Sequence, residues 1–113
     1  FFGPAQSGFT ATYTYSLDEQ SIHLAYILKK AKEKGATRIE ASEEAEEKWI
    51  KTIIDKARLT ADFQENCTPG YYNNEGKVNQ TPQNNTYGGG PIEFFSLMKK
   101  WRSKDNLEGL ELS

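Results

Sequence analysis

The chain has 113 residues, a length that suits one domain or a piece of one. Hydrophobic residues make up 36% and charged residues 27%, so the sequence can support only a modest core. With a formal net charge of -2 and no apolar run of membrane-spanning length, neither nucleic acid nor a membrane is expected as a partner.

The cysteine count bears on the cellular compartment. The single cysteine, Cys67, cannot form a disulfide within the chain, and no basic-then-apolar leader is visible, so we expect a cytoplasmic protein. The alternative is a secreted glycoprotein, because three Asn-x-Thr triplets are present, although such triplets also arise by chance in an Asn/Thr-rich stretch. The triplets begin at Asn66, Asn79 and Asn84.

Residues 1–15 combine turn formers with a weak strand signal. The apolar pair Phe1-Phe2 precedes breaker pairs at 3–4 and 7–8, and residues 10–15 are β-branched or aromatic. Because a natural protein seldom begins with an exposed Phe-Phe pair, we expect the chain to be a piece of a longer protein.

A first helix is predicted to start at Ser16. Ser16 and Glu19 form a capping-box pattern, lysines gather towards the other end, and Gly35 is a natural residue to follow the helix. The apolar residues between them recur at helical spacing. They are Leu17, Leu24, Leu28 and Ala31, with Ala25 and Ile27 beside them.

A short strand and a second helix follow. Residues 37–41 are a strand candidate, and Ser42 caps a helix whose acidic residues at 43–47 complement the positive helix end. The apolar side of this helix predicts that it runs to about Ala61. That side is formed by Trp49, Ile50, Ile53, Ile54 and Ala57.

A long aromatic and glycine-rich segment, 62–90, has no helical or strand period, and segments of this kind in compact chains are often functional. Pro91 fits the first position of a third helix. Its apolar face is formed by Ile92, Phe95, Met98 and Trp101, with Phe94 and Leu97 beside it. Residues 107–112 form a weak strand that we expect to pair with 38–41.

The predicted fold class is therefore mainly α with short β strands. It comprises three helices, one two-stranded pairing and the long loop, and we find no internal repeat or coiled-coil heptad.

The candidate reactive residues, considered without any family resemblance, do not indicate a particular reaction. His23, the only histidine, fits an ordinary structural or surface position, and Cys67 has no nearby base in sequence and no set of zinc ligands. Glycines 88–90 lead into a helix N-terminus that could hold an anion, but close backbone passage is the interpretation that we favour.

Two loop motifs carry a resemblance to a known family. Residues 67–76 (CTPGYYNNEG), residues 87–95 (YGGGPIEFF) and the later Trp101-Arg102 pair resemble the C-terminal part of Baeyer–Villiger-type flavin monooxygenases. Residues 2–9 (FGPAQSGF) resemble the segment beside the flavin ring in that family. The segments 17–20, 36–40 and 44–49 resemble the helix–strand–helix that follows it, so the resemblance covers nearly the whole chain.

Enzymes of this family use FAD and NADPH to add one oxygen atom of O2 to a ketone, which gives an ester or a lactone. The resemblance implies that Gly8, Phe9 and Thr10 lie near the flavin, and that Phe9 and Thr10 also border the substrate. The helix that starts at Ser16 would approach the flavin ring through its N-terminus, whose amides stabilise negative charge on a reduced flavin.

The resemblance also implies that residues 62–90 close over the nicotinamide cofactor and exclude water. Asn66 and Cys67 would then contact the cofactor, while Tyr71 and Tyr72 would contact the substrate. Cys67 departs from the family pattern, because many relatives that oxidise ketones carry a tryptophan at this place.

The chain then divides into a flavin-adjacent segment with helices (1–61), the cofactor-closing loop (62–90) and a terminal helix and strand (91–113).

The dinucleotide-binding motifs and the arginine that assists the flavin have no counterpart here. We therefore expect the C-terminal part of a larger α/β FAD- and NADPH-binding fold, inactive alone and binding neither cofactor by itself. Its partners would be the upstream domains and a small ketone. The alternative is an autonomous binding or dimerisation module that uses the tyrosine-rich loop for a carbohydrate or a protein.

Overall fold

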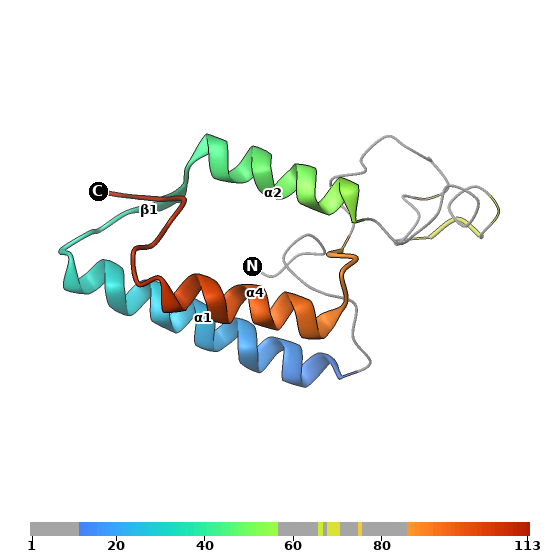
Figure 1. Cartoon of the computed structure of the whole chain (residues 1–113), viewed down its shortest axis with the longest axis horizontal. Helices are drawn as coiled ribbons and strands as arrows, with labels where there is room; N and C mark the ends of the chain where they lie inside the picture. Colours follow the sequence, from blue (N-terminus) through green and yellow to red (C-terminus); the bar gives the residue numbers. More distant parts are fainter. Residues whose placement is uncertain (1–11, 57–65, 67, 71–74, 76–85) are drawn as a thin grey trace.

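The computed structural model describes residues 12–56, 66, 68–70, 75 and 86–113, and its elements run α1–β1–α2–α4–β2 (Figure 1). In this part of the chain three helices accompany one two-stranded sheet, so the predicted fold class is confirmed. Helices α1 and α4 lie side by side and run in the same direction, while α2 runs the opposite way. The elements are α1 (Tyr13–Glu33), β1 (Ile39–Ala41), α2 (Glu43–Asp55), α4 (Pro91–Ser103) and β2 (Leu110–Leu112).

The two strands pair antiparallel, as the sequence predicts. Ile39 faces Leu112, and Ala41 faces Leu110. Because each strand has only three residues, the pairing is extended on both sides by further backbone bonds. The amides of Thr37 and Arg38 donate to the carbonyl of Ser113 at 2.7 Å, and the amide of Ser42 donates to Gly109 at 2.9 Å.

Helix α1 begins at Tyr13, before the predicted start at Ser16, so the capping-box assignment is wrong. The amide of Ser16 donates to the carbonyl of Thr12 at 3.3 Å, which makes Ser16 a helical residue. The strand signal at 10–15 is likewise wrong for residues 13–15, while residues 10 and 11 lie outside the described residues. Packing overrides the β propensity here, since the ring of Tyr15 meets the edge of Phe95 at 5.2 Å between centroids.

The other end of α1 confirms the prediction for Gly35. The amide of Gly35 donates to Lys32 at 3.0 Å and that of Ala36 donates to Ala31 at 3.0 Å, the two bonds of a Schellman motif. Gly35 has φ of +71°, in the left-handed region that favours glycine.

Helices α2 and α4 begin where the sequence predicts. The Oγ atom of Ser42 accepts from the amide of Ala45 at 3.3 Å, and Pro91 takes the first position of α4. Helix α2 ends at Asp55, earlier than the predicted end near Ala61, and Lys56 is its C-cap residue. Residues 57–61 lie outside the described residues.

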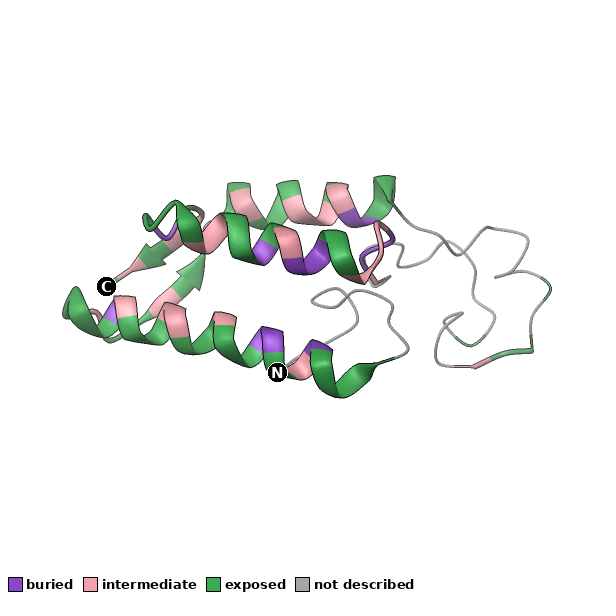
Figure 2. Cartoon of the chain, turned by 60° about the horizontal axis from the view of Figure 1, so that its bottom comes forward, coloured by how far each residue is buried: buried purple, intermediate pink, exposed green. Residues whose placement is uncertain are grey.

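The hydrophobic core lies between α4 and the C-terminal half of α2 (Figure 2). It contains Ile53, Tyr87, Phe94, Phe95 and Met98, and Trp49 packs against it. Ile92, predicted on the buried face of α4, is instead 81% exposed. At 100° per residue it points about 160° away from Phe94 and about 120° away from Met98.

The leucines of α1 also depart from the expected core face. The buried residues of α1 are Ser16, Glu19, Gln20 and Ala31, whereas Leu24 and Leu28 remain about half exposed. None of the described helices has the length and apolar character that crossing a membrane would require.

Replacing Gly35 with alanine should destabilise the chain through the backbone alone. A Cβ atom at Gly35 would meet nothing within 4 Å, so only the left-handed conformation penalises it. We expect Gly35→Ala to lower the free energy of unfolding by about 1 kcal/mol, measured by urea denaturation. Gly70→Ala is the control, because Gly70 has no positive φ and a Cβ atom there would make only an ordinary contact. An equal loss in both variants would contradict this explanation.

Candidate functional site

Most residues that the sequence assigns to a site lie outside the described residues. These are Gly8, Phe9, Thr10, Cys67, Tyr71 and Tyr72, whose roles therefore stay predictions. Asn66 is described and is exposed. The structure does describe two regions that border these segments, namely the base of the 62–90 loop and the N-terminal half of α1 with its neighbour α4.

The chain on the two sides of the loop is held together by three side chains, which we call the loop clamp: Lys56, Tyr87 and Glu93. Lys56 follows α2, and Glu93 lies in the first turn of α4. The ammonium group of Lys56 and the hydroxyl of Tyr87 both donate to the same carboxylate oxygen, Oε1 of Glu93. Residues 37 positions apart are thereby joined directly.

Tyr87 is the centre of the clamp and is only 1% exposed. Its ring stacks on Trp49 with centroids 5.7 Å apart and an interplanar angle of 10°, and it lies 5.8 Å from the ring of Phe94. The ammonium nitrogen of Lys56 lies 5.3 Å from the centroid of the Tyr87 ring, within the range of a cation–π contact. Tyr87 thus ties the clamp to the hydrophobic core.

The glycine run beside Tyr87 is explained by steric contact. A Cβ atom at Gly89 would lie 2.5 Å from Cε1 of Tyr87, closer than real Cβ atoms come. Gly90 has φ of +89°, again in the left-handed region. Close backbone passage, the interpretation that the sequence favours for glycines 88–90, is therefore confirmed for Gly89, whereas a Cβ atom at Gly90 would meet nothing within 4 Å and only its φ favours glycine there.

The electrostatics of the clamp suit a structural role. Burial, followed by the hydrogen bond to Glu93, raises the pKa of Tyr87 above its ordinary value. The hydrogen bond to Glu93, followed by that to Tyr87, raises the pKa of Lys56. At neutral pH Tyr87 is therefore a protonated donor and Lys56 a cation, so both can hold the carboxylate of Glu93.

A second polar cluster joins α1 to α4 around Glu19. Its Oε1 atom accepts from the hydroxyl of Tyr15 at 3.1 Å and lies 3.3 Å from Nζ of Lys99. Its Oε2 atom lies 3.9 Å from Nη2 of Arg102. Because the Glu19 side chain is only 9% exposed, these cations compensate a nearly buried charge. Glu19 thus stabilises the helix pair, in place of the capping role that the sequence suggests.

His23 packs into the same interface one turn further along α1. Its ring lies 5.0 Å from that of Trp101, and Nη1 of Arg102 lies 3.3 Å from its Nδ1 atom. Burial, followed by the charge of Arg102, lowers the pKa of His23 below 6.5. A neutral ring can accept a hydrogen bond from Arg102, which agrees with the structural interpretation of this histidine.

The C-terminal half of α1 is fastened to the end of α4 as well. The hydroxyl of Tyr26 donates to the carbonyl of Arg102 at 3.2 Å and also to Asp105. Nζ of Lys30 lies 2.9 Å from Asp105. The position of α1 is therefore fixed along nearly its whole length.

Sequence reasoning noted Tyr87 but missed its partners Lys56 and Glu93. Glu93 follows the usual preference for acidic residues in a first helical turn, so its sequence position alone gives no reason to assign it another role. No periodicity or motif in a single sequence indicates that Lys56 and Glu93 are in contact.

Comparison with known proteins places the chain among flavin enzymes. It is 46% identical over 109 residues to neopentalenolactone D synthase of Streptomyces avermitilis, a match that covers 96% of this chain and 18% of that protein. It is 39% identical over 103 residues to a Baeyer-Villiger monooxygenase of Streptomyces coelicolor, covering 90% of this chain and 17% of that protein. It is also 31% identical over 108 residues to FAD-binding monooxygenase hmp7 of Hypomyces subiculosus, covering 95% and 18%.

The chain is similar over nearly its whole length to a piece of Baeyer–Villiger-type flavin-dependent monooxygenases. It corresponds to a C-terminal piece of them and spans about a fifth of the length of the relatives that it matches (18% for the first of them). The resemblance that the loop motifs carry is therefore confirmed. No family model matches the chain, and no solved structure matches it.

The loop clamp of this monooxygenase piece can be tested by removing one hydroxyl. Tyr87→Phe keeps the stacked ring but leaves Glu93 without one donor, so we expect the free energy of unfolding to fall by about 1 kcal/mol in urea denaturation. Tyr13→Phe is the matched control, because Tyr13 is largely exposed. Similar losses in both variants would show that the hydroxyl of Tyr87 adds nothing specific.

The lowered pKa of His23 predicts a pH dependence of stability. Because the unfolded chain binds a proton more readily at this position, stability should fall as the pH drops from about 7.5 to about 5.5. We expect His23→Gln to reduce the slope of melting temperature against pH in this window. The lowered pKa values of Asp105 and Glu108 act at more acidic pH and leave the window unaffected. An unchanged slope in the variant would contradict the assignment.

Proposed function

We propose that the chain is the C-terminal piece of an FAD- and NADPH-dependent monooxygenase that inserts one oxygen atom of O2 into a ketone. The overall reaction converts a ketone, O2, NADPH and a proton into an ester or lactone, NADP+ and water. The observation that carries this proposal is the similarity over nearly the whole chain to proteins named as monooxygenases, one of them as FAD-binding.

The N-terminus of α1 fits the approach to a flavin that the family resemblance implies. Its first turn contains no acidic residue, so no carboxylate there compensates the positive end of the helix dipole. Gly8, Phe9 and Thr10 precede this end in the chain and would lie beside the flavin and the substrate. When bound, FAD would supply the redox chemistry with O2, while these residues bind and orient.

The loop clamp supports the closing role that we propose for residues 62–90. A loop whose ends are already held together needs less ordering to close, because part of the closure entropy has been lost in advance. Lys56, Tyr87 and Glu93 hold those ends. Asn66, Cys67, Tyr71 and Tyr72 would then fold over the nicotinamide cofactor and the substrate and exclude water.

The partners in this proposal are the flavin- and NADPH-binding parts of the same polypeptide, together with a small ketone. The chain alone would be inactive, since the motifs that bind the two dinucleotides have no counterpart in it. Its own contribution would be to position the flavin-facing end of α1 and the closing loop.

The proposal is tested on the full-length protein that carries this chain. We expect NADPH consumption that depends on a ketone, and an ester or lactone that gains one ¹⁸O atom when the reaction is run under ¹⁸O2. The isolated chain is the matched comparison and should neither retain flavin nor consume NADPH. Full-length protein that forms no labelled product from a panel of cyclic and linear ketones would overturn the proposed reaction. Stoichiometric flavin on the isolated chain would overturn its dependence on the upstream parts.

A further inference from the structure

Helix α1 has two different faces, and only the more polar one is in contact with α4. The contact face presents Glu19, His23, Tyr26 and Lys30, whose side chains meet α4 or the turn that follows it. A second face, which we call the leucine face, consists of Leu17, Leu24 and Leu28. At 100° per residue it lies about 150° around the helix from the contact face, nearly opposite it. On it, Leu24 is 46% and Leu28 is 54% exposed.

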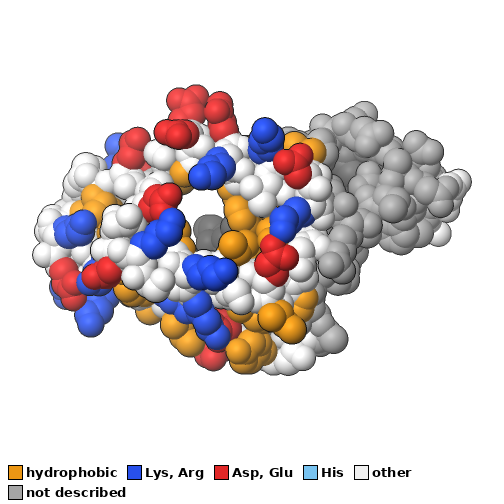
Figure 3. All heavy atoms as spheres, viewed as in Figure 1, with side chains coloured by type: hydrophobic (Ala, Val, Ile, Leu, Met, Phe, Trp, Pro, Cys, Tyr) orange, Lys and Arg blue, Asp and Glu red, His pale blue; other side chains and the backbone are white. Residues whose placement is uncertain are grey.

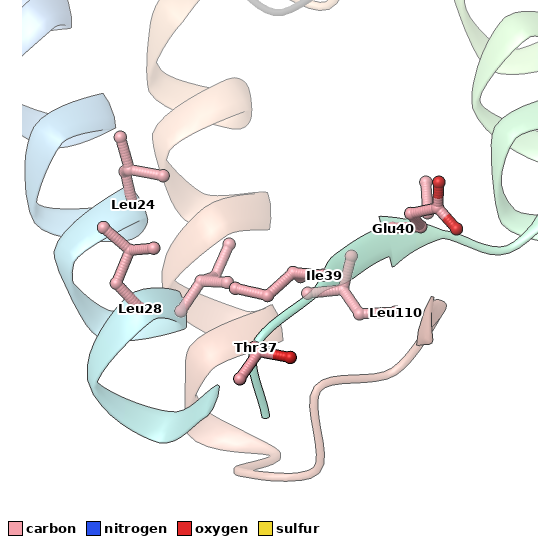
Figure 4. A pocket seen from close by; sticks show the side chains of 8 residues that line it. Leu24, Leu28, Thr37, Ile39, Glu40 and Leu110 are labelled. Carbon is pink, nitrogen blue, oxygen red and sulfur yellow. The ribbon is translucent and has the colours of Figure 1, made fainter. Parts of the chain in front are cut away.

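The leucine face forms one wall of an open groove. Leu24, Ile27 and Leu28 line it from α1, and Ile39, Ala41 and Leu110 line it from the strand pair. Thr37 and Glu40 supply the polar part of the lining. In the view of Figure 1, hydrophobic side chains lie among charged ones over the described part of the surface (Figure 3). Figure 4 shows Leu24 and Leu28 on α1 across from Ile39 and Leu110.

This arrangement is unusual for a helix that packs mainly against one other helix among the described elements. A helix normally buries its apolar stripe and exposes its charged residues, yet α1 buries Glu19 and leaves the leucines open to solvent. Burial of Glu19 is compensated by Lys99 and Arg102, so the contact with α4 is complete without the leucines. Such a helix fits between two neighbours, with α4 on its polar side and an apolar neighbour on its leucine side.

We propose that the leucine face and its groove are the docking surface for the flavin-binding part of the same polypeptide. The match to each relative covers nearly all of this chain but less than a fifth of the relative, so in those proteins the equivalent piece is tethered to a much longer segment. Tethering raises the effective concentration of that segment to about the millimolar range, well above that of a second copy or a free peptide. The proposal rests on the proposed function only for the existence of the flavin-binding part.

The test is protection from alkylation in the full-length protein. Leu28→Cys places a thiol on the leucine face, and Ile92→Cys places a matched thiol on α4, where the native side chain is exposed. Modification by N-ethylmaleimide is followed over time by mass spectrometry of the peptides, which separates these sites from Cys67 and any other cysteine. We expect the thiol at position 28 to react at least about tenfold more slowly than the thiol at position 92, because it reacts only after the interface opens.

Equal rates at the two sites would overturn the proposal. Protection that disappears on dilution would also overturn it, because it would make a second copy the occupant. If Leu28→Cys protein does not fold, Leu24→Cys gives the same comparison on the same face. The readout needs no ketone and no turnover, so protection without ketone oxidation would retain the docking surface while removing the proposed reaction.

Discussion

The arrangement of this chain depends on one nearly buried carboxylate. The Glu19 side chain is only 9% exposed, and Lys99 and Arg102 compensate its charge inside the interface. Removing either cation would leave the carboxylate with a single charged partner inside the interface. The pair therefore sets the position of α1 relative to α4.

Helix α4 transmits this position to the rest of the molecule. Its first turn carries Glu93 of the loop clamp, its middle carries the buried Phe94, Phe95 and Met98, and the strand β2 that pairs with β1 follows its end. One helix thus links the base of the 62–90 loop, the hydrophobic core and the two-stranded sheet. Because the contact between α4 and α1 is mainly polar, Leu24 and Leu28 of α1 remain exposed on the opposite face of that helix.

Local signals in the sequence predicted the local structure well. The Ser42 cap, the Pro91 start, the Gly35 end and the short strand pair each depend on residues close in the chain or on simple pattern matching, and each is confirmed. The start of α1 and its buried face were mispredicted for a common reason. Glu19 forms ion pairs with residues some 80 positions away, and the pattern of residues within the helix gives no sign of those pairs. Of the candidate site, Tyr87 could be noted as an aromatic residue in the loop, but its pairing with Lys56 through Glu93 required the folded chain.

The loop clamp has a consequence for how sequences of this family can vary. The Tyr87 ring leaves no room for a side chain at Gly89 and is stacked on Trp49, so packing fixes this boundary of the loop. The other boundary, Lys56, is held by its ion pair with Glu93. An exchange of residues 57–86 between homologous proteins should therefore keep Lys56, Tyr87 and Glu93 constant, because these three side chains join the two ends.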